Sequence, residues 1–109
     1  MKINDYKLFY SVGTHIAFDN WAVNNQKASY TEGIIMKFLL MCESYNSAVK
    51  SGFLEGKEQT VPKKEDIAMM PNAYFEEISK MVAACEKRDT TRQVEEEPIK
   101  GKNGKSAAK

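Results

Sequence analysis

The chain has 109 residues, of which 42% are hydrophobic and 28% are charged, and its formal net charge is +1. This length accommodates one domain with a single modest core and excludes a second domain. The composition is that of an ordinary globular protein, and the near balance of charges excludes a strong field for nucleic acid or anionic lipid.

The N-terminal part is expected to hold a short strand followed by a helix. Aromatic and β-branched residues alternate from Tyr6 to Val12, which predicts a strand with one apolar face. Gly13 suits a sharp turn and Thr14 suits a helix cap. A first helix is therefore predicted from Thr14 to Asn24.

A second helix has a clearer start. Ser29 followed three residues later by Glu32 is a capping box, in which each side chain bonds the other residue's backbone amide. The helix is predicted to run to Ser51, with Gly52 as its left-handed C-cap.

Prolines and glycines organise the segment that follows. Residues 52–62 are predicted to form a loop. Only a short helix fits between Pro62 and Pro71, because a proline inside a helix displaces the chain. Pro71 is acceptable as the first residue of a third long helix, which is predicted to end at about Lys87. The apolar residues of that helix follow a helical period and predict one buried face: Tyr74, Phe75, Ile78, Met81, Val82 and Cys85.

The C-terminal residues change in composition. Residues 95–109 are rich in Glu, Lys and Gly and are expected to be a disordered charged tail, which leaves residues 1–94 as the single domain. Arg92 to Glu95 is expected to pair with the N-terminal strand. The predicted fold is thus mainly α, a small single-domain helical protein with three longer helices, one short helix and that small strand pair.

The residues that carry chemistry do not form a recognisable site. His15 is the only histidine and has only Asp19 close by in the sequence, so a helix-start polar residue is favoured over a metal ligand. Cys42 and Cys85 lie within apolar helical patterns and are predicted to be buried free thiols. We therefore expect no catalytic residue, no metal site and no cofactor, and the chain is not expected to be an enzyme.

No apolar run reaches the roughly 20 residues that a bilayer span requires, and the N-terminus lacks the pattern of a secretory signal. The expected location is the cytoplasm.

The second helix carries apolar residues on two faces. Its predicted core face consists of Tyr30, Ile34, Phe38, Met41, Cys42, Tyr45, Ala48 and Val49. Met36 and Leu40 lie nearly opposite, flanked by small residues that permit close approach. Two readings stay open: the first helix covers this strip, or the strip is an intermolecular contact. The candidate interface residues are Phe18, Trp21, Gly33, Met36, Leu40 and Ser44.

Several segments, taken in order, resemble the tail assembly chaperones of long-tailed bacteriophages and of prophages of Gram-positive bacteria. They are KLFYSVGTHIAFDNW at the start, the stretch from Glu65 to Pro71, the helix AYFEEISKMVAAC, and KRDTTRQVEEE followed by the Lys/Gly-rich end. The resemblance implies a small helical protein of the bacterial host cytoplasm that binds and solubilises the tape measure protein before the tail tube polymerises. Such proteins often self-associate, and many have a longer product made by frameshifting.

A different class of function is a small phage or prophage regulator associated with nucleic acid through its Lys-rich end. The helices lack a basic recognition face, so neither nucleic acid nor a membrane is the expected partner. Salt-dependent retention on DNA would distinguish this class from a chaperone.

Overall fold

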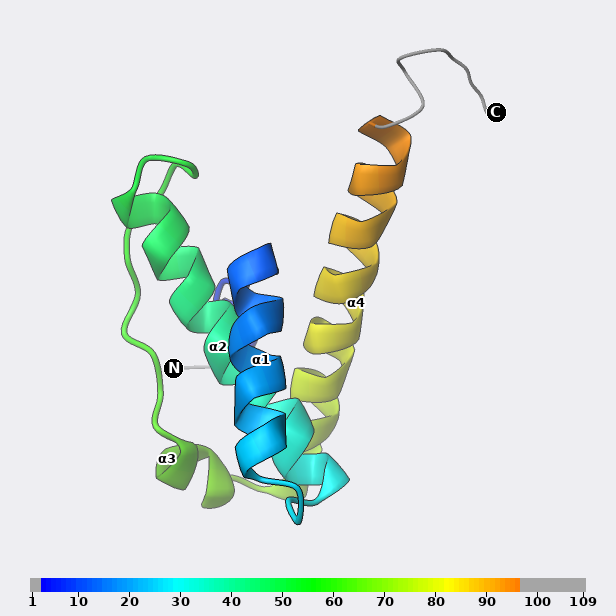
Figure 1. Ribbon diagram of the computed structural model, residues 1–109. Helices are drawn as coiled ribbons and strands as arrows, with labels where there is room; N and C mark the ends of the chain where they lie inside the picture. The colour runs from blue at the N-terminus through cyan, green and yellow to red at the C-terminus, as the bar shows by residue number, and fades with distance from the viewer. Residues whose placement is uncertain (1–2, 97–109) are drawn as a thin grey trace.

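The structure, a computed structural model, describes residues 3–96, with side chains as far as residue 87. It is mainly helical, and the three longer helices and one short helix that the sequence predicted are all present (Figure 1). In chain order the elements are the 3₁₀ helix η1 (Ile3–Asp5) and the α-helices α1 (Val12–Asn24), α2 (Tyr30–Lys50), α3 (Lys64–Ala68) and α4 (Asn72–Glu96).

The predicted strand from Tyr6 to Val12 is wrong, since residues 3–96 contain no strand. The alternation itself has a structural counterpart, because Tyr6, Leu8 and Tyr10 all pack against the core. What is missing is a partner strand. Arg92 to Glu95, expected as that partner, lies within α4.

Isolated hydrogen bonds hold the extended segment instead. The Phe9 amide donates to the Met41 carbonyl at 3.2 Å. The Gln59 side-chain amide bonds both backbone groups of Lys7: the Lys7 amide donates to Oε1 at 2.8 Å, and Nε2 donates to the Lys7 carbonyl at 2.7 Å. One side chain therefore does here what a neighbouring strand does in a sheet.

The first helix begins earlier than predicted. Ser11, not Thr14, is its N-cap, and Gly13 lies in its first turn. The Ser11 hydroxyl accepts from the Thr14 amide at 3.1 Å, while the Thr14 hydroxyl accepts from the Ser11 amide at 3.0 Å. This is a capping box with Thr in the place that Glu or Gln usually takes.

The boundaries of α2 are confirmed. The Ser29–Glu32 capping box is formed, with both hydrogen bonds at 3.1 Å. Gly52 has a φ of +85°, the left-handed conformation that ends a helix with little strain. The amide of Phe53 then donates back to the Ala48 carbonyl at 2.8 Å.

The two prolines bound α3 as expected, and α4 starts directly after Pro71. The α4 helix continues past the predicted end at Lys87 to Glu96, so residues 95 and 96, assigned to the tail, are helical. The rest of the predicted tail, 97–109, lies outside the described residues.

The core forms where α2 packs against α4, with η1 on α4 and α3 on α2. Both cysteines are buried and free, as predicted. Tyr30 and Tyr74 were assigned to the core, but Tyr30 is 76% exposed and Tyr74 is 37% exposed. Both lie in the first turn of a helix, at the periphery of the packed region. The buried apolar cluster consists of Ile3, Phe38, Leu39, Met41, Cys42, Ile67, Ile78, Val82 and Cys85.

Candidate interaction surface

The candidate interface residues all lie on two helices that pack together. Phe18 and Trp21 are on α1, and the other four, Gly33, Met36, Leu40 and Ser44, are on α2. The hydroxyl groups of Thr14 on α1 and Ser44 on α2 are hydrogen-bonded. The Phe18 ring lies over Gly33, where a Cβ would be 3.9 Å from Phe18 Cζ. At Gly33 and Ser44 the strip on α2 is therefore a contact within the molecule, and α1 covers it.

Lys37 connects α1, α2 and α4 beside this contact. Its Nζ lies 5.0 Å from the centre of the Phe18 ring and 3.0 Å from Glu86 Oε2 on α4. The Phe18 and Trp21 rings are 5.7 Å apart. A partly buried cation over an aromatic ring contributes on the order of 1 kcal/mol, which adds to the packing of α1 on α2.

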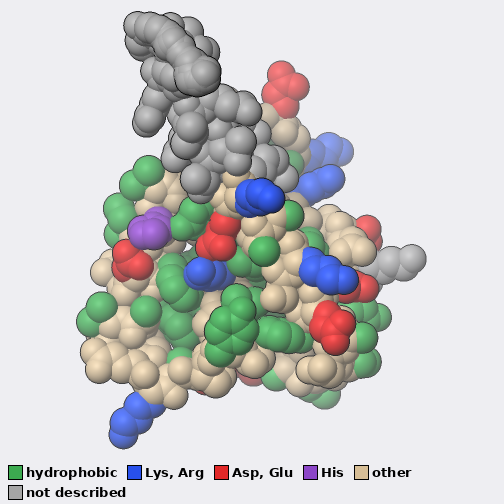
Figure 2. Space-filling model, turned by 90° about the vertical axis from the view of Figure 1, so that its right-hand side faces the viewer, with side chains coloured by type: hydrophobic (Ala, Val, Ile, Leu, Met, Phe, Trp, Pro, Cys, Tyr) green, Lys and Arg blue, Asp and Glu red, His purple; other side chains and the backbone are tan. Residues whose placement is uncertain are grey.

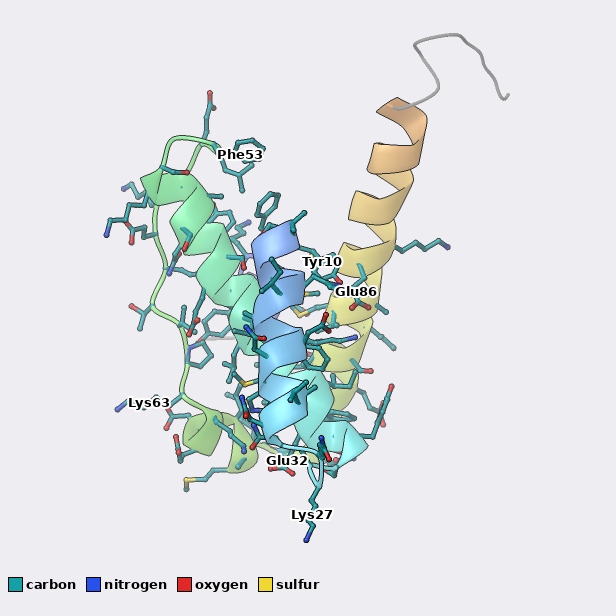
Figure 3. The ribbon with its side chains drawn as sticks, in the orientation of Figure 1. Tyr10, Lys27, Glu32, Phe53, Lys63 and Glu86 are labelled. Carbon is teal, nitrogen blue, oxygen red and sulfur yellow. The ribbon has the colours of Figure 1, made fainter. Side chains whose placement is uncertain are left out.

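Leu40 is partly buried and lines a groove between the two helices. We call this hollow the α1–α2 groove; it measures about 690 Å³. Phe53 stands at the upper end of α2 (Figure 3), and its ring is 5.8 Å from that of Phe9. The groove is lined by Phe9, Ser11, Gly13, Ala17, Leu40, Glu43, Ser44, Ser47, Ala48, Ser51 and Phe53.

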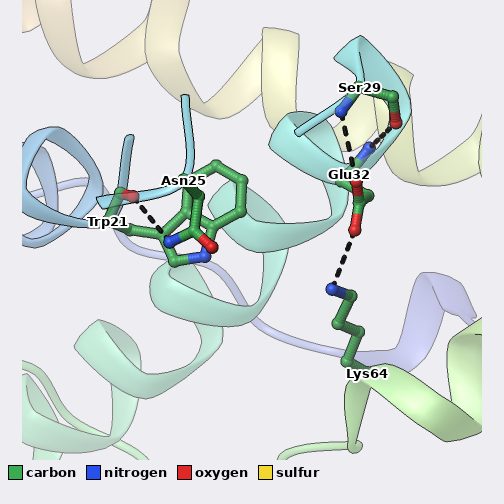
Figure 4. A network of polar contacts seen from close by, with 5 residues as sticks. All are labelled: Trp21, Asn25, Ser29, Glu32 and Lys64. Carbon is green, nitrogen blue, oxygen red and sulfur yellow. Dashed lines mark hydrogen bonds and ion pairs between the residues drawn. The ribbon is translucent and has the colours of Figure 1, made fainter. Parts of the chain in front are cut away.

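A second, smaller hollow of about 310 Å³ lies toward the other end of the same helix pair. We call it the aromatic hollow because Phe18, Trp21 and Tyr30 all line it. Polar contacts organise its rim (Figure 4): Asn25 Nδ2 donates to the Trp21 carbonyl at 2.8 Å. In the same view, Lys64 Nζ of α3 lies 3.0 Å from Glu32 Oε2.

The outer side of α1 carries three exposed apolar residues, with the exposed Asp19 between them. Val12, Ile16 and Val23 are 70%, 54% and 66% exposed, and their spacing places them along one line of the helix. Only His15 and Asp19 are ionisable in the whole of α1. Surface helices usually carry charged residues on the side away from the core. Figure 2 shows hydrophobic side chains gathered over the left half and the centre of one face of the molecule.

His15 belongs to a short chain of polar contacts at the start of α1. The Tyr10 hydroxyl and His15 Nδ1 are 2.6 Å apart, and His15 Nε2 is 3.4 Å from Asp19 Oδ2. Burial and the nearby Glu86 raise the pKa of Tyr10, which disfavours the nucleophilic tyrosinate. The arrangement therefore positions the N-terminal segment on α1 and does not activate a nucleophile.

The buried thiol of Cys42 is likewise unreactive, because burial raises its pKa to about 12 and the thiolate is the reactive form. Among the side chains that the structure describes, which end at residue 87, no group of three or more His, Cys, Asp or Glu is arranged to hold a metal ion. In the same part of the chain, no helix is both long and apolar enough to cross a lipid bilayer.

Sequence reasoning did not find the groove walls or the exposed line on α1. Phe9 was assigned to a strand, and Phe53 to a loop without a role. The spacing i, i+4, i+11 of Val12, Ile16 and Val23 was a signal, but it is readable only once α1 is known to begin at Val12. A comparison with protein-family models, curated proteins and solved structures found no match to this chain.

Proposed function

We propose that this protein is a tail assembly chaperone that binds the phage tape measure protein and keeps it soluble until the tail tube forms. The observation that carries the proposal is the nature of α1, whose apolar side chains point both toward α2 and into solvent. The ordered resemblance of the N-terminal, central and α4 segments to such chaperones supplies the identity of the partner.

The physical argument concerns surplus apolar surface. An exposed Val or Ile side chain leaves up to about 1.5–3 kcal/mol of burial free energy unused, so apolar residues on the outer side of a helix are usually covered by a neighbour. The exposed line on α1 gives this protein apolar area beyond what its own core uses. A chaperone for a long amphipathic helix needs such area, because it must cover the apolar stripe of its client.

Co-expression tests the proposal directly. The tape measure protein is expressed alone, with the wild-type protein, and with a double variant, Ile16→Glu and Val23→Lys, whose net charge is unchanged. We expect wild type to raise the soluble fraction of the tape measure protein and the variant to lose most of this effect. Charges at a contact that becomes buried on binding are costly, whereas at these exposed positions they leave the free monomer folded.

The matched control exchanges an exposed pair on α4, Glu76→Lys with Lys80→Glu, which also alters two positions without changing the net charge and lies on a helix that does not pack against α1. This control should solubilise the tape measure protein as well as wild type does. If wild type itself leaves the tape measure protein insoluble, the chaperone function is refuted. A very long, coiled-coil-rich reading frame directly downstream of the gene is the genomic observation that we expect.

A further inference from the structure

The floor of the α1–α2 groove follows the geometry of a helix. Its residues on α2 and at the C-cap Ser51 are spaced 3, 1, 3, 1 and 3 positions apart, so they share one side of the helix: Leu40, Glu43, Ser44, Ser47, Ala48 and Ser51. Within this stripe Ser44 also bonds Thr14 of α1, and Ala48 is buried. Eleven steps along a helix span roughly 16 Å, or three turns. The groove therefore runs along α2 for about the length over which two packed helices usually touch.

Most residues of this stripe are small, and so are the α1 residues that face it. Four of the six α2 positions are Ser or Ala, and α1 contributes Gly13 and Ala17 opposite them. Small side chains let helix axes approach toward the lower end of the usual range of about 8–10 Å. At one end the groove is bounded by the rings of Phe9 and Phe53, and Phe53 is 74% exposed. The shape fits a helix lying between an aromatic wall and Leu40.

A single charge defines the electrostatics of the groove. Glu43 is the only charged residue among those lining it, and its exposed carboxylate forms no ion pair with any side chain that the structure describes. A carboxylate at the edge of an apolar groove favours a partner with a cation beside its apolar stripe. The chain's own exposed apolar line, on α1, contains no Lys or Arg. A second copy docking through α1 would thus leave Glu43 without a partner.

From this geometry we propose that the α1–α2 groove binds one helix of another protein, with an apolar stripe of about three turns and a Lys or Arg at its edge that pairs with Glu43. The inference rests on the proposed function, because it specifies which part of the tape measure protein the chaperone would hold. In this arrangement Glu43 selects a partner that carries a cation, and the small residues of α2 select a helix that can approach closely.

The test uses two synthetic 18-residue helical peptides that differ in one position. Both carry Leu at i, i+3, i+4, i+7, i+8 and i+11 on an Ala-rich background, and one has Lys, the other Glu, beside the Leu stripe. We expect the Lys peptide to bind the full-length protein more tightly than the Glu peptide by about threefold or more, the size of a rim ion pair. Amide chemical shifts in NMR spectra should change along the α1–α2 groove and not at the aromatic hollow.

Two tryptophan substitutions, one inside the groove and one outside it, show where the peptide binds. Ser47→Trp fills the floor of the groove from an exposed position and should abolish peptide binding, whereas Thr31→Trp, also exposed on α2 but outside the groove, should not. Glu43→Lys should reverse the preference between the peptides, and it remains a test even if Ser47→Trp fails to fold.

Equal binding of both peptides, shifts confined to the aromatic hollow, or undiminished binding to a folded Ser47→Trp variant would overturn the inference. So would a wild-type dimer that Ser47→Trp dissociates, because the occupant would then be a second copy.

The two proposals fail separately. Peptide binding without solubilisation of the tape measure protein refutes the chaperone function alone, and solubilisation that Ser47→Trp leaves intact refutes the groove alone.

Discussion

The hydroxyl of Thr14 on α1 is hydrogen-bonded to that of Ser44 on α2, and Thr14, at 2% exposure, is the buried polar side chain of the described part of the chain. Thr14 also caps α1 through Ser11 and donates to the Phe9 carbonyl at 3.4 Å. One hydroxyl thus joins the N-terminal segment, the start of α1 and the middle of α2.

These contacts predict unequal costs for two substitutions. Ser44→Ala removes one hydrogen bond and leaves Thr14 with its other partners, so the free energy of unfolding should fall by about 0.5–1.5 kcal/mol. Thr14→Ala also removes the bonds of this hydroxyl with the Ser11 amide and the Phe9 carbonyl, while the Ser11 cap stays, and should cost about 2–3 kcal/mol. Urea denaturation of both variants measures the difference. Ser47→Ala, an exposed serine one turn away, is the control and should change the free energy by less than about 0.5 kcal/mol. Equal losses at Thr14 and Ser44 would contradict this account.

Two residues of the predicted core should differ in how much they stabilise the protein. Ile78 is fully buried between α4 and α2, so Ile78→Ala should lower the free energy of unfolding by about 2–5 kcal/mol through lost burial and a residual cavity. Tyr30 belongs to the predicted core face of the second helix but is 76% exposed. Tyr30→Ala should therefore change the thermal midpoint only slightly. A large loss at Tyr30 would mean that this ring is covered in solution, for instance by a second molecule.

The junction between α2 and α3 predicts a pKa change. The hydrogen bond from Lys64, together with the backbone bond at Ser29, holds the pKa of Glu32 below its ordinary value. Lys64→Ala should raise that pKa, which NMR titration of the side-chain carboxyl measures directly. Because the folded pKa is the lower one, the pair stabilises the protein above the ordinary carboxyl pKa, and this contribution is lost as pH falls through the folded pKa. Lys63→Ala, next to it and exposed, should leave the titration of Glu32 unchanged.

The buried thiol predicts protection from reagents. With a pKa of about 12, Cys42 is almost entirely the neutral thiol at pH 8. In a Cys85→Ala background, the reaction of Cys42 with a disulfide reagent should be slow for the folded protein and fast in denaturing urea. Fast labelling under native conditions would show that α2 and α4 separate often enough to admit the reagent.

The features of the fold that sequence predicted well are those that local chemistry determines. The Ser29–Glu32 capping box and the left-handed Gly52 define α2, and Pro62 and Pro71 bound α3, because each acts on backbone groups only a few residues away. The apolar period of α4 identified Ile78, Val82 and Cys85 as buried for the same reason.

The features that sequence did not predict depend on contacts between residues that are far apart in the chain. The alternation from Tyr6 to Tyr10 has the period of a strand, but whether a strand forms depends on what lies alongside. Here Gln59, far away in the sequence, supplies the hydrogen bonds. The α1–α2 groove was also hidden from the sequence, since Phe53 reaches it only because the chain reverses at Gly52. Of the predicted interface residues on α2, Leu40 and Ser44 line the groove, whereas Met36 does not.

Among the described helices, α1 packs against α2 alone. It contributes no residue to the buried apolar cluster, so α1 can open while the core of α2, α4, η1 and α3 stays intact. Such local unfolding costs less free energy than global unfolding and makes amide hydrogens exchange sooner. The amides of α1 should therefore exchange with solvent deuterium before those of α2 and α4, and any ligand held in the α1–α2 groove should slow them.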